Sequence, residues 1–276
     1  MSSPDLHRLS LNQATTQNWP MDETIDGCAR AGVGWIGLWR HKVAELGVPE
    51  TARRLRGAGL KVSSLCRGGF FPAPSEAERL ARIEDNRRAI DEACELGAPV
   101  LVLVCGPAPD HDIDAARAMV LDGICAVAEY AAEHGVKLAI EPLHPMYAGD
   151  RSVVVTLRQA NAVAERMASP CVGVAVDVYH VWWDPDLERE IERAGGYSGR
   201  LMAFHLCDWL VPTADLLLDR GMMGDGVIDL PLIRSWMEAA GYRGPHEVEI
   251  FSERNWWKRD PDEVLATCVA RHQTVC

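Results

Sequence analysis

The sequence predicts an α/β fold in which a parallel sheet closes into a barrel, and three observations lead to it. Eight short apolar runs with strand character alternate with eight helical segments along 276 residues. Their repeat is close to the roughly 30 residues that one strand-plus-helix unit occupies when eight units share about 250 residues. No glycine-rich dinucleotide or phosphate-loop fingerprint follows a strand, which disfavours an open, doubly wound sheet. We therefore expect a (β/α)8 TIM barrel.

The expected strands are apolar runs that stop where polar residues or glycine begin. The run over 99–105 is apolar throughout, as in a strand that is covered on both faces. The eight strands are expected over residues 6–11, 33–39, 60–66, 99–105, 136–141, 172–177, 200–207 and 245–251. Strict alternation with helices implies a parallel sheet with right-handed crossovers, so all strands end at the same mouth.

The expected helices begin at polar capping residues, and several end at glycine. Ser75 with Glu78 three residues later is a capping-box signature, and Gly59 is a C-terminal glycine signal. The helices are expected over residues 22–31, 48–56, 75–96, 112–134, 156–167, 185–193, 230–240 and 260–271. Arg40, His41 and the segment 67–72 are expected in loops. Because no low-complexity linker interrupts the pattern, residues 1–276 are expected to form one domain.

Composition excludes several classes of partner. A hydrophobic share of 48% and a charged share of 25% match an ordinary soluble globular protein. The formal net charge of -12 argues against a nucleic-acid partner, which needs a concentrated basic face. An acidic chain is also not attracted to an anionic membrane surface. We expect a small-molecule substrate, with no nucleic acid and no membrane as partner.

The cysteines and the N-terminal segment indicate the compartment. Nine cysteines are scattered without a C-x-x-C pair, which fits a reducing environment better than a disulfide framework. No basic segment followed by an apolar stretch opens the chain, so no signal peptide is expected. No apolar run approaches the roughly 18 residues that span a bilayer. The expected localisation is cytoplasmic.

Four successive strands end in a side chain that can bind a metal ion, at separations of 36, 28 and 44 residues: Glu141, Asp177, His205 and Glu249. Taken singly, each has a commoner structural role, such as a helix cap or a core histidine. Together, at matching ends of neighbouring strands, they favour one shared mononuclear site. Carboxylates and imidazole suit Mn²⁺, Mg²⁺, Co²⁺ or Zn²⁺. Glu247 points to the same strand face as Glu249 and remains the alternative.

Tryptophan is unusually frequent, with nine residues against four phenylalanines. Six of them fall in expected strand-to-helix loops on the side of the mouth: Trp39, Trp182, Trp183, Trp209, Trp256 and Trp257. These residues are candidates for pocket walls, with Trp39 as a substrate-binding candidate. A rim that packs against a partner subunit in a homo-oligomer is an equal alternative.

Five motifs carry a family resemblance, namely those over residues 141–145, 177–180, 204–208, 224–229 and 241–244 leading to Glu249. They resemble the xylose-isomerase-like TIM-barrel superfamily, and within it the branch of sugar (phosphate) isomerases and epimerases. The match is tight from Glu141 to Trp257, with residues 34–40 as weaker support. The spacing from Gly241 and Tyr242 supports Glu249 over Glu247.

The resemblance implies one divalent metal ion, with Mn²⁺ the first choice, held by Glu141, Asp177, His205 and Glu249. It also implies that Glu141 and Glu249 move a proton next to a carbonyl, through an enediolate that the metal stabilises. His180 is expected to hydrogen-bond a substrate oxygen. Two weaker candidates for the same task are His144 and Asp208.

The sequence leaves the substrate open. Arg151 and Arg254 are weak indications of a phosphate, so a free sugar or cyclitol is slightly favoured. A dehydratase of keto-inositols or a lyase of oxidised glycosides would use the same metal constellation. An endonuclease IV-type nuclease shares the barrel but needs about three zinc ions and a basic groove. A barrel that binds a sugar without turnover is the third alternative.

Overall fold

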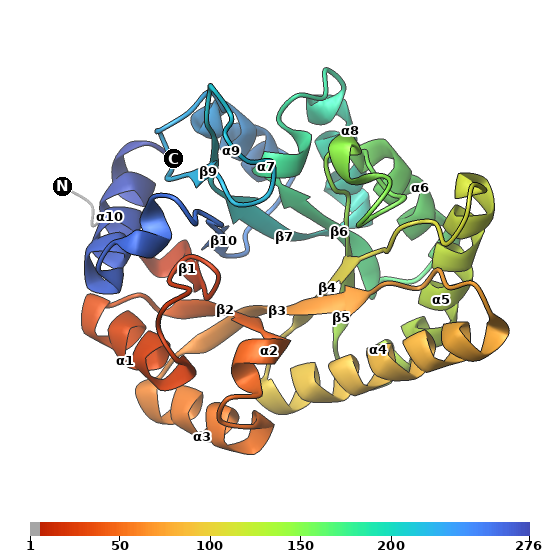
Figure 1. Cartoon of the computed structure of the whole chain (residues 1–276), viewed down its shortest axis with the longest axis horizontal. Helices are drawn as coiled ribbons and strands as arrows, with labels where there is room; N and C mark the ends of the chain where they lie inside the picture. The colour runs from red at the N-terminus through yellow and green to blue at the C-terminus, as the bar shows by residue number, and fades with distance from the viewer. Residues whose placement is uncertain (1–5) are drawn as a thin grey trace.

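A closed ring of eight parallel strands forms the centre of the chain, with helices packed around its outside (Figure 1). The computed structural model describes residues 6–276 except the side chain of Tyr197. Around the ring the strand order is β1-β10-β7-β6-β5-β4-β3-β2, so β1 closes the barrel against β10. The strands of the ring are β1 (Leu9–Asn12), β2 (Trp35–Trp39), β3 (Lys61–Gly69), β4 (Val100–Val104), β5 (Lys137–Glu141), β6 (Val172–Asp177), β7 (Leu201–Leu206) and β10 (His246–Val248). The fold class predicted from the sequence is confirmed.

Helices connect the strands in the expected alternation. The α-helices are α1 (Met21–Ala31), α2 (Arg40–Val43), α3 (Val48–Ala58), α4 (Glu76–Leu96), α5 (Ile113–Glu133), α6 (Leu157–Met167), α7 (Val178–Val181), α8 (Leu187–Ala194), α9 (Leu230–Ala239) and α10 (Pro261–Thr274). Short 3-10 helices are η1 (Leu6–Arg8), η2 (Pro145–Tyr147), η3 (Gly196–Ser198) and η4 (Trp256–Lys258). At the start of α4 the Ser75 hydroxyl accepts from the Glu78 amide at 3.3 Å and donates to its carboxylate at 2.7 Å, so the capping box is confirmed.

Two short strands lie outside the ring. β8 (Asp208–Trp209) and β9 (Arg220–Gly221) pair in antiparallel fashion within the segment that joins β7 to α9. The backbone amide of Arg220 also donates to the Phe251 carbonyl at 2.8 Å. These bonds fold the segment after β7 back over the end of the barrel.

Several element boundaries differ from the expectation. Residues 6–8, expected in the first strand, form η1, and β1 begins at Leu9. Arg40 and His41, expected in a loop, begin the short helix α2. β3 continues to Gly69 because the backbone there pairs with β4 and the Gly69 amide donates to Asn86 Oδ1 at 2.6 Å. β10 ends at Val248 rather than near residue 251, because the Ile250 amide donates to the Thr15 hydroxyl at 2.9 Å instead of to a neighbouring strand.

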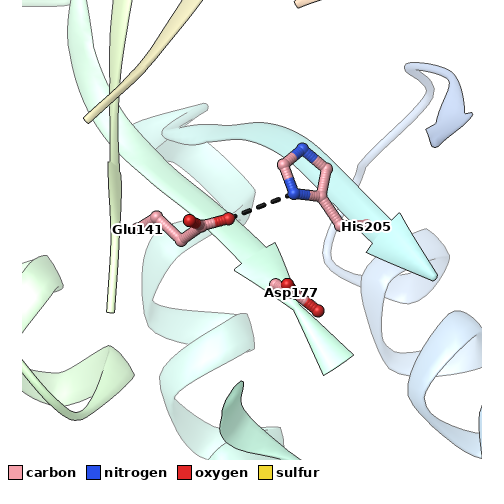
Figure 2. A group of neighbouring side chains, drawn as sticks. All are labelled: Glu141, Asp177 and His205. Carbon is pink, nitrogen blue, oxygen red and sulfur yellow. Dashed lines mark ion pairs between the residues drawn. The ribbon is translucent and has the colours of Figure 1, made fainter. Parts of the chain in front are cut away.

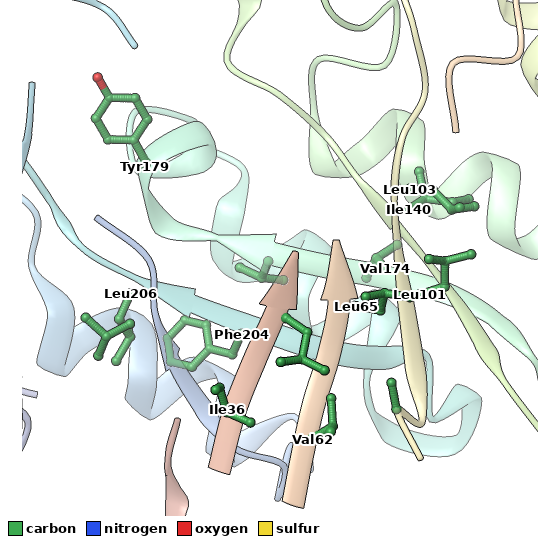
Figure 3. Packing of buried hydrophobic residues seen from close by; sticks show 14 of the residues in the cluster. Ile36, Val62, Leu65, Leu101, Leu103, Ile140, Val174, Tyr179, Phe204 and Leu206 are labelled. Atoms are coloured by element: carbon green, nitrogen blue, oxygen red, sulfur yellow. The ribbon is translucent and has the colours of Figure 1, made fainter. Parts of the chain in front are cut away.

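Alternation along each strand separates an outer face from an inner face. The outer-facing residues pack against the helices in one large apolar cluster, of which Figure 3 shows members from Ile36 on β2 to Leu206 on β7. The inner face carries small or short side chains, including Ala139, Ala175 and Ala203. Because these side chains are small, the barrel interior has room for polar groups near the strand ends.

Two further observations bear on the expected class of protein. No helix among residues 6–276 is long and apolar enough to cross a bilayer. All nine cysteines lie within the described residues and are free, as expected from their spacing.

Candidate metal centre and pocket

The predicted metal-binding side chains stand at matching strand ends of the barrel. Glu141 and Asp177 are the last residues of β5 and β6, His205 is the second-last residue of β7, and Glu249 directly follows β10. Glu141, Asp177 and His205 have the same parity as Ala139, Ala175 and Ala203 on the inner face, and Glu249 lines the central pocket, so all four point into the barrel. Exposure is 5% or less for each of them.

Glu141, Asp177 and His205 come closest to one another. One ligand atom from each lies within 4.8 Å of the others, and Figure 2 shows the imidazole of His205 facing the carboxylate of Glu141. His205 Nδ1 lies 3.1 Å from Glu141 Oε1. Glu141 Oε1 and both His205 nitrogens are nevertheless buried without a hydrogen-bond partner among the described residues. Buried polar atoms are normally paired, so this arrangement fits a site for a divalent cation.

The charges around His205 support the same interpretation. Burial acts to lower the pKa of His205, but the carboxylates of Glu247, Glu141 and Glu249 raise this pKa well above its ordinary value. Several buried carboxylates therefore concentrate negative potential at one point, which favours a positive charge there. A divalent cation bound by the imidazole would supply that charge in place of a proton.

Glu249 lies beside the triad. Its Oε2 is 3.9 Å from His205 Nδ1, its Oε1 accepts from Asn12 Nδ2 at 3.0 Å, and it lines the central pocket. Glu247, the alternative, lies deeper. It accepts hydrogen bonds from Asn12 at 2.6 Å, Ser63 at 2.6 Å and Ser64 at 2.9 Å, and it does not line the pocket. These contacts favour Glu249 as the side chain that meets a ligand.

Arg220 is a site residue that the sequence analysis missed. It is only 3% exposed. Its Nη1 lies 2.9 Å from Asp177 Oδ2 and 3.2 Å from Glu249 Oε2. The guanidinium carbon stands 4.5 Å from the centre of the Tyr179 ring and 4.8 Å from that of Phe251. The segment around Arg220 has no strand or helix periodicity, so only the path of the folded chain reveals its role.

In the metal-free site, the pKa values of Asp177 and Glu249 are shifted in opposite directions. Burial acts to raise the pKa of Asp177, but the charge of Arg220, with smaller contributions from His180 and His205, holds it below its ordinary value. For Glu249, burial and the neighbouring carboxylates raise the pKa to about 8, against the opposing charges of His205 and Arg220. One carboxyl group therefore favours the ionised form and the other favours a proton, as acid–base chemistry requires.

His180 follows Asp177 on the short helix α7 and lines the pocket. Burial lowers its pKa to about 3, in spite of the raising effect of Asp177, so the ring is neutral at neutral pH. Its Nδ1 accepts a hydrogen bond from the His144 amide at 3.2 Å. Its Nε2 lies 3.6 Å from Asp177 Oδ2 and 3.3 Å from Arg220 Nη2, so this side of the ring contacts the charged groups of the site.

The remaining substrate-binding candidates, Trp39, His144 and Asp208, lie in different places. Trp39 lines the pocket, and its indole donates to Asn12 Oδ1 at 2.8 Å. His144 lies outside the pocket lining, where its ring packs 5.3 Å from that of Trp209. Asp208 is fully buried, and its carboxylate accepts from four backbone amides of residues 209, 224, 226 and 228. Asp208 thus holds the segment after β7 in place, away from the pocket.

The pocket above these side chains has a cavity volume of about 280 Å³, which suits a small molecule. Its floor carries Glu141, Glu249, His180 and Arg220, and aromatic side chains form part of its wall. Of the tryptophans expected at the mouth, Trp39 and Trp257 line it. The cavity therefore combines a polar, charged floor with apolar walls, as small-molecule sites do.

Known proteins resemble the chain over most of its length. The crystal structure of protein SMc04130 from Sinorhizobium meliloti 1021 matches with a TM-score of 0.96 and 56% identity over 99% of both chains. The IolI protein, solved with a binding zinc atom, matches with a TM-score of 0.83 at 20% identity over 96% of both chains, which shows the fold alone. The L-ribulose-5-phosphate 3-epimerase UlaE of Salmonella typhi is 27% identical over 206 residues, covering 71% of this chain and 66% of the epimerase.

The family match covers the site itself. The model of the xylose isomerase-like TIM barrel family matches residues 25–268, a range that contains the triad, Glu249 and Arg220. The resemblance seen in the motifs at the strand ends is thereby confirmed. The chain belongs to the xylose isomerase-like TIM barrel family.

Proposed function

We propose that the protein is a divalent-metal-dependent sugar isomerase or epimerase. Its substrate is a ketose, a keto-polyol or a phosphate of one of these, and the reaction moves a proton on the carbon next to the carbonyl. The buried set of Glu141, Asp177 and His205 beside a small polar pocket supports a metal-assisted reaction on a small molecule. The similarity to a sugar-phosphate 3-epimerase supports the substrate class.

Four side chains would hold the cation: Glu141, Asp177, His205 and Glu249. This donor set suits Mn²⁺ first, and also Mg²⁺, Co²⁺ or Zn²⁺; the zinc in the similar IolI structure supports a bound cation in this fold. The bound cation would polarise the substrate carbonyl and so make the neighbouring C–H acidic. The observation that carries the proposal is the pair of buried His205 nitrogens without a hydrogen-bond partner, next to Glu141.

The protein's own residues would move the proton. Glu141 and Glu249 come from strands of the ring that are separated by β6 and β7, so they approach the substrate from different sides. One carboxylate removes the proton from the carbon next to the carbonyl, and the other carboxyl group returns a proton to the opposite face. Both carboxyl groups are buried at the pocket, where they can meet the substrate without competing water.

Neighbouring side chains would position both the substrate and the carboxylates that act on it. His180 is neutral and lines the pocket, so its ring can form a hydrogen bond with a substrate oxygen. Arg220 stays charged between Asp177 and Glu249 and fixes both carboxylates in place. Trp39 and Trp257 provide apolar wall against which a sugar ring can stack.

Metal analysis and turnover test the proposal together. We expect about one divalent ion per chain by elemental analysis, and Mn²⁺-dependent formation of a reversible stereoisomer from one member of a ketose and inosose panel. Glu249→Gln should lower kcat by about 10²–10⁴-fold. Glu253→Gln is the control, because Glu253 is exposed and does not line the pocket, and it should keep turnover.

Two results would contradict the proposal. Wild-type protein that binds no divalent metal would remove its basis. Irreversible loss of water or of an aglycone, rather than a stereoisomer, would assign the same site to a dehydratase or lyase instead.

A further inference from the structure

An arginine without an acidic partner faces the proposed active site. Arg67 follows Cys66 on β3 and lines the same pocket as Glu141 and Glu249. Its guanidinium carbon lies 3.9 Å from the centre of the Phe70 ring. Among the described residues it has no ion pair and no hydrogen bond from its side chain. The forked donors of Arg67 are therefore open toward the pocket, since stacking on a ring leaves the N–H groups unused.

A second arginine lines the same cavity. Arg151 stands over the Tyr147 ring at 5.6 Å, and its nearest acid is Asp150, with Nε 3.6 Å from Oδ2. That distance is beyond a hydrogen bond, and Nε is buried without a hydrogen-bond partner. Burial first, and then the charges of Arg151 and Arg40, lower the pKa of Arg67. The two pocket arginines thus act on each other as like charges.

This arrangement differs from that of other arginines in the chain. Arg40, beside the pocket, is neutralised by Asp85 at 3.0 Å and Glu92 at 2.7 Å. Arg220, on the pocket floor, is neutralised by Asp177 and Glu249. In a chain with 40 acidic and 28 basic residues, partners for the pocket arginines would be plentiful. Arg67 has no carboxylate partner among the described residues, and the ion pair of Arg151 is with the exposed Asp150 at 3.6 Å. Together the two guanidinium groups favour an anion as a further partner.

The neighbouring cavities give such an anion room. Arg67 also lines a cavity of about 510 Å³ that holds Arg40, His41 and Arg82. Arg151 also lines a cavity of about 460 Å³. Each of the two arginines therefore lines both the central pocket and a second cavity.

We propose that the substrate carries an oxyanion group, a phosphate or a carboxylate, at the end remote from its carbonyl, and that Arg67 and Arg151 bind this group. The inference rests on the proposed function, because the same pocket holds the reacting end of the substrate over Glu141 and Glu249. It replaces the slight preference for a free sugar that the sequence favoured.

Matched substrates test the proposal by kinetics. With Mn²⁺ bound, wild-type enzyme should turn over a ketopentose 5-phosphate, or a ketose that ends in a carboxylate, with a higher kcat/KM than the corresponding neutral ketose. Arg67→Gln should raise KM for the anionic substrate by about 10-fold or more, since hydrogen bonds to charged groups are worth about 1.5–3 kcal/mol. The KM of the neutral ketose should not change. Arg67→Lys should recover part of the loss, because it keeps the charge without the fork.

Comparing the substrate that carries a phosphate with the one that carries a carboxylate shows which of the two anions the site prefers. Arg254→Gln is the matched control. Arg254 is exposed and lines none of the three cavities, so its loss removes the same charge without touching the pocket. A wild-type preference for the neutral ketose would overturn the proposal. So would an equal effect of Arg67→Gln on the neutral and the anionic substrate.

A binding measurement separates this inference from the proposed function. Inorganic phosphate titrated by calorimetry into EDTA-treated protein should bind at least 10-fold more weakly to Arg67→Gln than to wild type. If that difference is found while no ketose is turned over, the anion site stands and the proposed isomerase does not. If neutral ketoses are turned over and phosphate binding does not depend on Arg67, the anion site fails alone.

Discussion

The guanidinium of Arg220 lies 2.9 Å from the carboxylate of Asp177, and both side chains are buried at the mouth of the barrel. The same guanidinium nitrogen reaches Glu249 at 3.2 Å. In metal-free protein, the guanidinium of Arg220 is therefore a close positive partner for both carboxylates. Removing it leaves buried negative charge without compensation, which is among the most destabilising changes a protein interior can suffer.

We therefore expect Arg220→Gln to lower the free energy of unfolding of metal-free protein by about 3–5 kcal/mol. Saturating Mn²⁺ should recover about 2.7 kcal/mol at 100 times its Kd, because the cation binds only the folded state. Urea unfolding with and without Mn²⁺ measures both values. Arg30→Gln is the control, since its pair with Asp262 is exposed and its loss should leave the free energy of unfolding nearly unchanged. A loss below that of Arg30→Gln would contradict the role assigned to Arg220.

Glu247 should matter for stability rather than for metal binding. Its carboxylate accepts from Asn12, Ser63 and Ser64, and all three donors are buried. Glu247→Ala removes one acceptor from Asn12 and Ser63 and leaves the Ser64 hydroxyl without its acceptor, at about 1–3 kcal/mol for a buried group that stays unpaired. We expect a clear fall in the urea midpoint with unchanged metal stoichiometry. Loss of the metal with unchanged stability would show that Glu247, and not Glu249, is the ligand.

Gly37 on β2 is required because Glu247 fills the space beside it. A Cβ at residue 37 would lie 2.0 Å from Glu247 Oε1, so the carboxylate would have to move. We expect Gly37→Ala to lower the free energy of unfolding by about 1–3 kcal/mol, the usual effect of overpacking. Gly34→Ala is the matched control, since its Cβ would meet nothing within 4 Å. Equal stabilities for the two variants would argue against the packing described for Glu247.

His246 should make the barrel sensitive to acid. Burial, with the nearby charges of Arg8 and Arg234, lowers its pKa to about 2, whereas the unfolded chain has an ordinary value near 6.5. Between these values the unfolded state binds a proton that the folded state excludes. The free energy of unfolding is therefore not reduced by this group above about pH 6.5. Below that pH it falls by about 1.4 kcal/mol per pH unit, because protonation favours the unfolded chain.

Replacing this histidine tests that slope. The fall in the free energy of unfolding between pH 7 and pH 5 should be smaller in His246→Gln than in wild type. His111→Gln, at an exposed position, should keep the wild-type slope. An unchanged slope in His246→Gln would show that its ring is protonated in the folded protein as well.

Strand ends were predictable because two local rules act there together. Apolar runs stop at Glu141 and Asp177, which are the last residues of β5 and β6. Alternation then sets which face each side chain takes. The same reasoning could not choose between Glu247 and Glu249, which share a face. Their difference lies in contacts with Asn12, Ser63 and Ser64 on β1 and β3, which are remote in sequence.

Arg220 and Asp208 mark the limit of such reasoning. Arg220 reaches the site because β9 pairs with β8 and its backbone amide binds residue 251, and none of these bonds leaves a periodic pattern. Asp208 looked like a binding residue next to His205, yet its oxygens are taken by four backbone amides. Both outcomes depend on how an irregular segment folds back, which local propensity does not encode.

The amide of Asn12 donates to Glu247 and Glu249, so the first strand of the chain positions the carboxylate that follows the last. These two strands meet only when the ring is joined end to end. A nascent or partly denatured chain whose final segment is undocked lacks a correctly oriented Glu249, the proposed proton-transfer group, whatever the state of its other strands. The site is therefore complete only once β1 pairs with β10 and the barrel closes. The rate at which turnover returns during refolding would measure that pairing step.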